Sequence, residues 1–257
     1  MEYLFARNYE SGELKAASFP SLRFYGRMAA IFWNAAKVAN AGRYSGERWA
    51  QDSQLVGQLI EDMGIHVSIE GIEHLDFNGP CVFEANHMST LETLFLPCII
   101  QPLCDVTFVV KRSLLKYPCL GPVLAAREPI ALGRTNPRED LKAVMEEGQK
   151  ILESGRSVII FTQGTRRTTV ETADFNSLGV KLARKANVPV VPIALKTDAW
   201  GEGSLIKDIG PINPALPVHV RFGAPVEIKG AGREEHTAIV DFIKTSFDAW
   251  VAADGKA

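Results

Sequence analysis

The fold is decided by the stretch Cys81–Glu92, which reads CVFEANHMSTLE. Its first part, Cys81–Ala85, is a short apolar run that predicts a strand, and an apolar helical pattern follows over Leu91–Ile100. A strand that leads through a turn into a helix is where open α/β sheets bind ligands. The turn carries His87, and a carboxylate follows at Glu92. Because a histidine near an acid is the usual means of taking a proton from a hydroxyl, this turn is the first candidate site.

The chain of 257 residues is long enough for one large domain or two small ones. Alternating strand and helix patterns favour one α/β unit, residues 65–257, behind a helical N-terminal section, residues 1–64. The continuous apolar run Ser157–Phe161 is typical of a strand in a parallel sheet. We therefore predict a mixed, largely parallel β-sheet flanked by helices. The formal net charge of -2 gives no general basic field, so nucleic acid is not an expected partner.

Several familiar kinds of site are not indicated. The four cysteines lack a paired Cys-x-x-Cys spacing and lie in or beside apolar runs, which favours buried thiols in a reducing compartment. The five histidines do not pair with carboxylates or cysteines at metal-binding spacing, so no metal site is expected. The sequence also has no nucleophile elbow, no phosphate-binding loop ending in Gly-Lys-Ser/Thr and no dinucleotide-binding fingerprint.

A helix is predicted over residues 20–41, where Arg23, Arg27 and Lys37 interrupt the apolar residues. Such a helix suits a membrane interface, with its basic groups toward anionic headgroups. It equally suits packing on the domain, with the basic side chains reaching out to water. No stretch has the roughly 18 apolar residues of a spanning helix, and the first residues lack a signal-peptide pattern. We therefore expect a cytoplasmic protein, peripheral at the cytoplasmic face of a membrane.

Further elements are predicted from apolar runs and turn residues. Strands are expected at His66–Gly71, Val106–Val110, Ile130–Leu132, Val188–Leu195, His219–Phe222 and Pro225–Ile228. Asn136 is expected to cap a helix that has Pro137 in its first turn and ends near Ser154. Polar and basic residues follow several strand ends, at Asn86-His87, Lys111-Arg112, Gly133-Arg134 and Gly164-Thr165-Arg166. These turns complete the candidate site.

Four blocks resemble, in order, the motifs of one known family. They are Asn86–Glu92, which resembles Asn-His-x-Ser-x-x-Asp; Gly133–Asn136, which resembles an arginine block; Phe161–Arg166, which resembles Phe-Pro-Glu-Gly-Thr-Arg; and Val188–Ile193, which resembles a Val-Pro-rich strand. By these blocks, the chain is similar to the 1-acylglycerol-3-phosphate (lysophosphatidate) acyltransferases, a family of glycerolipid acyltransferases. The match spans about residues 66–228, and four blocks in this order are specific although each alone is weak.

The resemblance implies transfer of a fatty acyl group from acyl-CoA or acyl-carrier protein to the free hydroxyl of a lysophospholipid. The first candidate is 1-acylglycerol 3-phosphate, giving phosphatidate, with the thioester as co-substrate and no cofactor. His87 would be the general base, and Glu92 would orient its ring and stabilise the imidazolium. The groups implied in acceptor and phosphate binding are Arg134, Arg166, Lys111, Gly164, Thr165 and Gln163. Asn86 and Ser89 would support the turn.

Two positions depart from the family pattern. Glu92 stands where Asp is usual, and Ser89–Glu92 is also typical of a capping box, with Ser89 as the N-cap and the carboxylate of Glu92 reaching back to its N–H. Thr162-Gln163 stands where Pro-Glu is usual, so a charge is lost. Three alternatives therefore stay open: another lysolipid, another hydroxylated acceptor, or an inactive lipid-binding homologue. The sequence does not indicate the oligomeric state.

Overall fold

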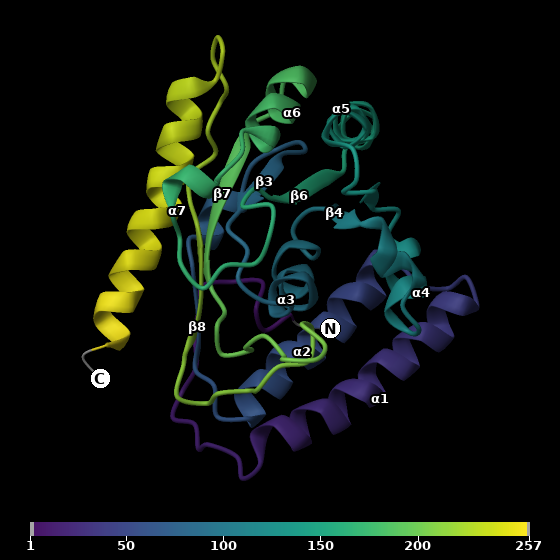
Figure 1. The fold of residues 1–257 in the computed structure, drawn as a ribbon, viewed down its shortest axis with the longest axis vertical. Helices are drawn as coiled ribbons and strands as arrows, with labels where there is room; N and C mark the ends of the chain where they lie inside the picture. Colours follow the sequence, from purple (N-terminus) through teal and green to yellow (C-terminus); the bar gives the residue numbers. More distant parts are fainter. Residues whose placement is uncertain (1–2, 256–257) are drawn as a thin grey trace.

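One eight-stranded sheet runs through the computed structural model, which describes residues 3–255 (Figure 1). The strands are β1 (Tyr9–Glu10), β2 (Val67–Glu70), β3 (Val82–Ala85), β4 (Val106–Lys111), β5 (Ile130–Leu132), β6 (Ser157–Phe161), β7 (Val190–Lys196) and β8 (Val218–Phe222). They lie in the order β1-β2-β8-β7-β3-β6-β4-β5. The pairs β1/β2 and β7/β8 are antiparallel and the others are parallel. The predicted mixed, largely parallel sheet is therefore confirmed.

Helices cover both faces of the sheet (Figure 1). The α-helices are α1 (Pro20–Asn40), α2 (Gly46–Asp62), α3 (Leu91–Ile100), α4 (Leu120–Ala125), α5 (Pro137–Glu153), α6 (Leu178–Ala186) and α7 (Arg233–Asp254), with short 3-10 turns at Ile72–Leu75, Arg112–Lys116 and Thr172–Asp174. One core lies under α1, α2 and α3, and a second lies under α5, α6 and α7. Within residues 3–255, no helix is both long and apolar enough to cross a bilayer.

The helical section predicted at residues 1–64 packs into the first core and also supplies β1. The first two residues of that section, and the last two of the section predicted at 65–257, lie outside the described residues. Phe5 is fully buried against Phe95 of α3, with ring centroids 5.1 Å apart. Tyr9 and Glu10 pair with β2, so His66–Gly71 contains the second strand along the chain. A strand of two residues is too short to give a periodic signal.

The predicted boundaries hold to within about two residues for most elements, with one clear error. The strand expected at Pro225–Ile228 is wrong, because only Val226 pairs there, in an isolated bridge to Val190. Proline has no N–H to offer a ladder, which limits pairing at the start of this segment. The cap at Asn136 is confirmed: its side chain accepts from the N–H of Arg138 at 3.1 Å.

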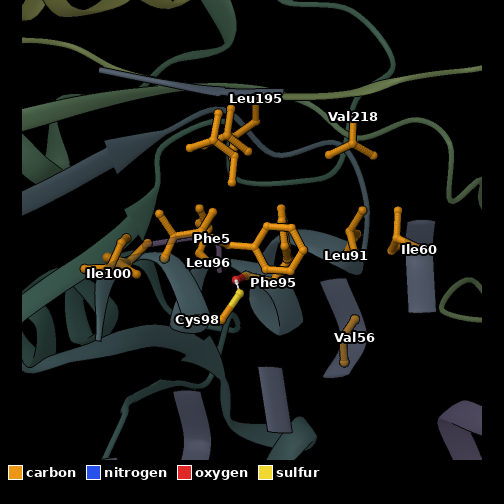
Figure 2. Packing of buried hydrophobic residues seen from close by; sticks show 14 of the residues in the cluster. Phe5, Val56, Ile60, Leu91, Phe95, Leu96, Cys98, Ile100, Leu195 and Val218 are labelled. Atoms are coloured by element: carbon orange, nitrogen blue, oxygen red, sulfur yellow. Dashed lines mark hydrogen bonds between the residues drawn. The ribbon is translucent and has the colours of Figure 1, made fainter. Parts of the chain in front are cut away.

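Helix α3 is held from both sides by apolar side chains. Figure 2 shows Leu91, Phe95 and Leu96 of α3 between Leu195 and Val218 of the sheet and Val56 and Ile60 of α2. Burying each side chain of this size stabilises the fold by about 1.5–3 kcal/mol. Because the helix is clamped in this way, the first turn of α3 keeps a fixed position relative to the end of β3.

The candidate turns meet at one edge of the sheet. Strands β3, β4, β5, β6 and β7 run in the same direction, so their carboxyl ends share that edge. The turns that follow them come from widely separated parts of the sequence. Parallel strand direction is therefore the physical reason that these polar and basic residues form one site.

Candidate active site

His87 and Glu92 form a close pair at the end of β3. Nδ1 of His87 lies 2.5 Å from Oε2 of Glu92, which is in the first turn of α3 and fully buried. The imidazole is partly exposed and stacks on Phe161, with centroids 4.4 Å apart and planes 16° apart. With the Nδ1 proton held by Glu92, a neutral imidazole carries its lone pair on Nε2. The pair thus presents Nε2 as a base.

The second oxygen of Glu92 is also fully used. Oε1 accepts hydrogen bonds from the N–H groups of Met88 and Ser89, at 2.7 and 2.9 Å, and from the hydroxyl of Thr197 at 2.6 Å. A buried carboxylate needs such donors, because burial without them is costly. The two interpretations of Glu92 are therefore compatible: one oxygen faces the histidine and the other reaches back to Ser89. Thr90, rather than Ser89, occupies the N-cap position.

Asn86 and Ser89 brace the turn from inside the protein. The side-chain amide of Asn86 makes two hydrogen bonds of 2.8 Å with the backbone of Leu195 on β7. The hydroxyl of Ser89 accepts from the N–H of Leu91 and donates to Thr197. Both side chains are buried. These contacts fix the backbone on either side of His87.

Gln163 lies beneath the turn. Its Oε1 accepts from the N–H of His87 at 2.8 Å, and its Nε2 donates to the carbonyl of Thr169 at 3.3 Å. The side chain is buried, with both polar ends directed to backbone groups of the chain. The resemblance implied an acceptor contact for this residue. In the structure Gln163 holds the His87 turn against the loop after β6, and its contact with the acceptor stays a prediction.

Arg166 reaches from the loop after β6 to the start of α3. Its guanidinium donates to the hydroxyl of Thr90 at 2.9 Å and lies 2.5 Å from the carboxylate of Asp208. Thr90 directly precedes α3, three positions after His87. The side chain of Arg166 is 20% exposed. A guanidinium in this place can bind an anionic group close to the histidine.

Arg134 approaches the same loop from the end of β5. Its guanidinium donates to the carbonyl of Gly164 at 3.3 Å, and the carboxylate of Asp140 accepts from the N–H groups of Gly133 and Arg134. Arg134 has a φ of 60°, and its side chain is exposed. The structure thus joins the second and third blocks through one side chain.

The remaining predicted residues are Gly164 and Thr165, in the loop after β6, and Lys111, at the end of β4. Gly164 has a φ of 66°, with no atom within 4 Å of the position that a Cβ would take, so its backbone shape rather than crowding favours glycine. Thr165 is exposed beside it. Lys111 is exposed at the end of β4 and, within the described chain, forms no hydrogen bond or ion pair with the histidine or the arginines.

Sequence reasoning missed Thr197 and Asp208. Thr197 directly follows β7, so the rule that identified the other strand-end turns could have found it. Asp208 lies in a loop without a motif, 42 residues after its partner Arg166, and nothing in the sequence links the two. No cluster of three or more His, Cys, Asp or Glu side chains suited to a metal ion occurs between residues 3 and 255.

Known proteins resemble this chain in sequence and in fold. A family model described as Acyltransferase matches residues 66–196. A 1-acyl-sn-glycerol-3-phosphate acyltransferase of Pseudomonas aeruginosa is 39% identical over 211 residues, which are 82% of this chain and 76% of that protein. One from Limnanthes douglasii is 27% identical over 76% of this chain, and the match spans 66% of its own length. The crystal structure of the 1-acyl-sn-glycerophosphate (LPA) acyltransferase PlsC from Thermotoga maritima has the same fold, with a TM-score of 0.63, 22% identity and coverage of 91% of this chain and 95% of that one.

Proposed function

This chain belongs to the acyltransferase family, and on that premise we propose that it acylates the free hydroxyl of 1-acylglycerol 3-phosphate to give phosphatidate. The names of the relatives from P. aeruginosa and L. douglasii support this acceptor. The observation that carries the proposal is the His87–Glu92 pair with Arg166 beside it, because it combines a base with a group suited to phosphate.

The reaction needs no covalent enzyme intermediate. Nε2 of His87 takes the proton from the acceptor hydroxyl as that oxygen attacks the thioester carbonyl. Glu92 stabilises the imidazolium that forms, since its Oε2 holds the Nδ1 proton. The tetrahedral intermediate then expels the thiolate, which receives the proton from His87. The products are the new ester and a free thiol.

Substrate binding uses charge and shape. The guanidinium groups of Arg166 and Arg134 suit a phosphate monoester, which they can bind through paired hydrogen bonds. The acyl group comes from acyl-CoA or acyl-carrier protein as co-substrate, and the scheme requires neither a metal nor a prosthetic group. Gln163 acts on the acceptor indirectly, through the backbone of His87.

Attachment to the cytoplasmic face of a membrane is part of the proposal. Helix α1 buries Phe24 and Met28 against the protein but leaves Leu22 and Trp33 76% and 59% exposed. Arg23 is exposed on the same helix. An amphipathic surface of this kind suits a lipid interface. Changing Leu22 and Trp33 to Ser should reduce co-sedimentation with anionic liposomes, and unchanged co-sedimentation would contradict the role of α1.

The acyl transfer is tested by thiol release. Purified protein given lysophosphatidate and acyl-CoA or acyl-carrier protein should release free thiol, and His87→Ala should lower the rate by about 10²–10⁴-fold. His74→Ala, in the 3-10 turn at Ile72–Leu75, is a matched control that should keep the wild-type rate. Thiol release unaffected by His87→Ala would exclude His87 as the base.

An acceptor panel separates the alternatives. Preference for another lysolipid or a hydroxylated amphiphile would revise the acceptor and keep the chemistry. Lipid binding without turnover for any donor would identify an inactive homologue instead.

A further inference from the structure

Residues 201–211, between β7 and β8, form a loop that is closed on itself (the yellow-green loop beside the α2 label in Figure 1). At its neck the N–H of Gly201 donates to the carbonyl of Pro211 at 3.0 Å, and nearer the tip the N–H of Gly203 donates to the carbonyl of Lys207 at 3.2 Å. A Cβ on Gly210 would lie 1.8 Å from the carbonyl oxygen of Gly201. A loop with such internal bonds can move as a unit.

Asp208 links this loop to two residues of the candidate active site, Arg166 and Thr90. Its carboxylate lies 2.5 Å from the guanidinium of Arg166 and accepts a hydrogen bond of 3.2 Å from the hydroxyl of Thr90. A carboxylate and a phosphate bind a guanidinium in the same way, through paired hydrogen bonds. Asp208 therefore occupies the guanidinium of Arg166, which is the group that would bind the acceptor phosphate.

The tip of the loop is apolar and exposed. Leu205, Ile206 and Ile209, on either side of Asp208, are 98%, 54% and 52% exposed, and Lys207 is exposed between them. Aliphatic side chains that cluster on a surface in this way mark an interaction site more often than scattered ones do. An aliphatic cluster with a basic residue fits the boundary between acyl chains and anionic headgroups.

The base of the loop rests on the first turns of α1. The hydroxyl of Tyr25 donates to the carbonyl of Gly210 at 2.6 Å, and the hydroxyl of Ser21 accepts from the N–H of Ile212 at 2.9 Å. Leu22, between these two contacts, is 76% exposed. These two bonds anchor the base of the loop on α1, the helix that also exposes Leu22.

We propose that residues 201–211 are a lipid-responsive gate on the acceptor site. With the gate closed, Asp208 holds Arg166. A bilayer that takes up Leu205, Ile206 and Ile209 withdraws Asp208 and leaves Arg166 free for the acceptor phosphate. The inference rests on the proposed function, because the phosphate competes with Asp208 only if Arg166 binds it.

The first test is kinetic. Asp208→Asn keeps the shape of the side chain and removes its charge, so the KM for a short-chain, monomeric lysophosphatidate should fall about tenfold without vesicles while kcat is unchanged. Vesicles of phosphatidylglycerol and phosphatidylethanolamine should lower the KM of the wild type and add little for the variant. Glu202→Gln is the matched control, since it removes the same charge from the same loop and should leave the KM unchanged.

Two kinetic outcomes would overturn the gate. A lower kcat in Asp208→Asn without a gain in KM would mean that Asp208 positions Arg166 for the reaction. An equal gain in Glu202→Gln would mean that any charge removed from the loop has the same effect.

The second test needs no turnover. Lysine acetylation read by mass spectrometry should show Lys207 protected by the same vesicles, whereas Lys150, exposed on α5, should react at the same rate with and without them. Changing Leu205 and Ile206 to Ser should remove the protection. If Lys207 is not protected in the wild type, the gate is wrong. If Lys207 is protected but no acceptor is acylated, the proposed function fails and the lipid contact of the loop stands.

Discussion

Two histidines of this chain face buried glutamates, and the two pairs differ in almost every other respect. Nδ1 of His87 lies 2.5 Å from Glu92 at the carboxyl edge of the sheet. Nδ1 of His236, on α7, lies 3.8 Å from Glu84 of β3, which is too far for a hydrogen bond. Both carboxylates are fully buried. Burial and a nearby imidazole are therefore common to the two pairs and cannot by themselves define a catalytic group.

The difference lies in the donors around each carboxylate. Glu92 accepts from two backbone N–H groups and a hydroxyl besides His87. Neither oxygen of Glu84 has a well-formed hydrogen bond among the described residues, although Thr162 and the backbone of Val180 lie close enough to oppose the shift in its pKa. Burial raises the pKa of Glu84 to about 8, so this side chain is mainly protonated at neutral pH. Donors, rather than depth, keep a buried carboxylate ready to stabilise an imidazolium.

The most direct test of this difference is the same substitution, Glu to Gln, at both positions. In Glu92→Gln the oxygen can keep the bonds from Met88, Ser89 and Thr197, so the amide nitrogen faces His87. That nitrogen donates, which forces Nδ1 to accept and leaves the proton on Nε2. We expect kcat to fall by about 10³–10⁴-fold, while Glu84→Gln keeps the wild-type rate. Equal effects at the two positions in the thiol-release assay would show that Glu92 has no special role.

The sequence was informative where chemistry is local. His87 and Glu92 are five residues apart, and Arg166 follows a strand, so block order and strand ends suffice to predict where they lie. The parallel sheet also follows from continuous apolar runs, because strands buried on both faces lose the alternating pattern. Everything at the site that depends on one strand and its own turn could therefore be predicted.

The pairings between residues far apart in the sequence could not be predicted, even where a strand end marks one of the two residues. Thr197 meets Glu92 across 105 positions, and Asp208 meets Arg166 across 42. The supporting position of Gln163 depends on the carbonyl of Thr169, which only the folded loop brings into reach. Such contacts depend on packing in three dimensions, which periodicity does not encode.

The next largest effect is expected in the free energy of unfolding of Glu84→Gln. Because burial raises the pKa of Glu84 from its usual 4.5 to about 8, the native state holds a proton that the unfolded chain loses. The stability contributed by the protonated form is full below about pH 4.5 and is lost as the pH rises toward 8. Glu84→Gln should remove that loss, with a gain on the order of 3–5 kcal/mol at pH 8 and little gain at pH 4.5. Denaturant unfolding at several pH values measures this gain in the free energy of unfolding. An equal gain at all pH values would contradict a protonated Glu84.

Gln163→Glu would place a carboxylate at another buried position, and its effect shows whether that carboxylate resembles Glu92 or Glu84. One new oxygen would accept from the N–H of His87, and the other would face the carbonyl of Thr169, where Gln163 now donates. An acceptor without a donor resembles Glu84 rather than Glu92, so we expect a loss of about 1–3 kcal/mol at pH 8. The loss should be smaller near pH 4.5, where a protonated acid can donate to Thr169.

Gln58→Glu is the control for this substitution, because it adds the same charge at an exposed position of α2. Its unfolding free energy should stay within about 0.5 kcal/mol of the wild type. If Gln163→Glu were equally neutral at pH 8, the buried amide would not be required by the carbonyl of Thr169.

The smallest effect is expected at His236. Burial lowers its pKa and Lys181 lowers it further, so the imidazole is neutral at pH 7 and costs stability only as the pH falls below its usual value of 6.5. His236→Phe should therefore add at most about 0.5 kcal/mol below pH 6 and nothing at pH 8. Because burial of Glu84 is the main cause of its raised pKa, the decline in stability toward pH 8 should keep its midpoint in this variant. A shift of that midpoint would mean that His236 and Glu84 are coupled as an ion pair. The longer distance between His236 and Glu84 would then not distinguish this pair from His87 and Glu92.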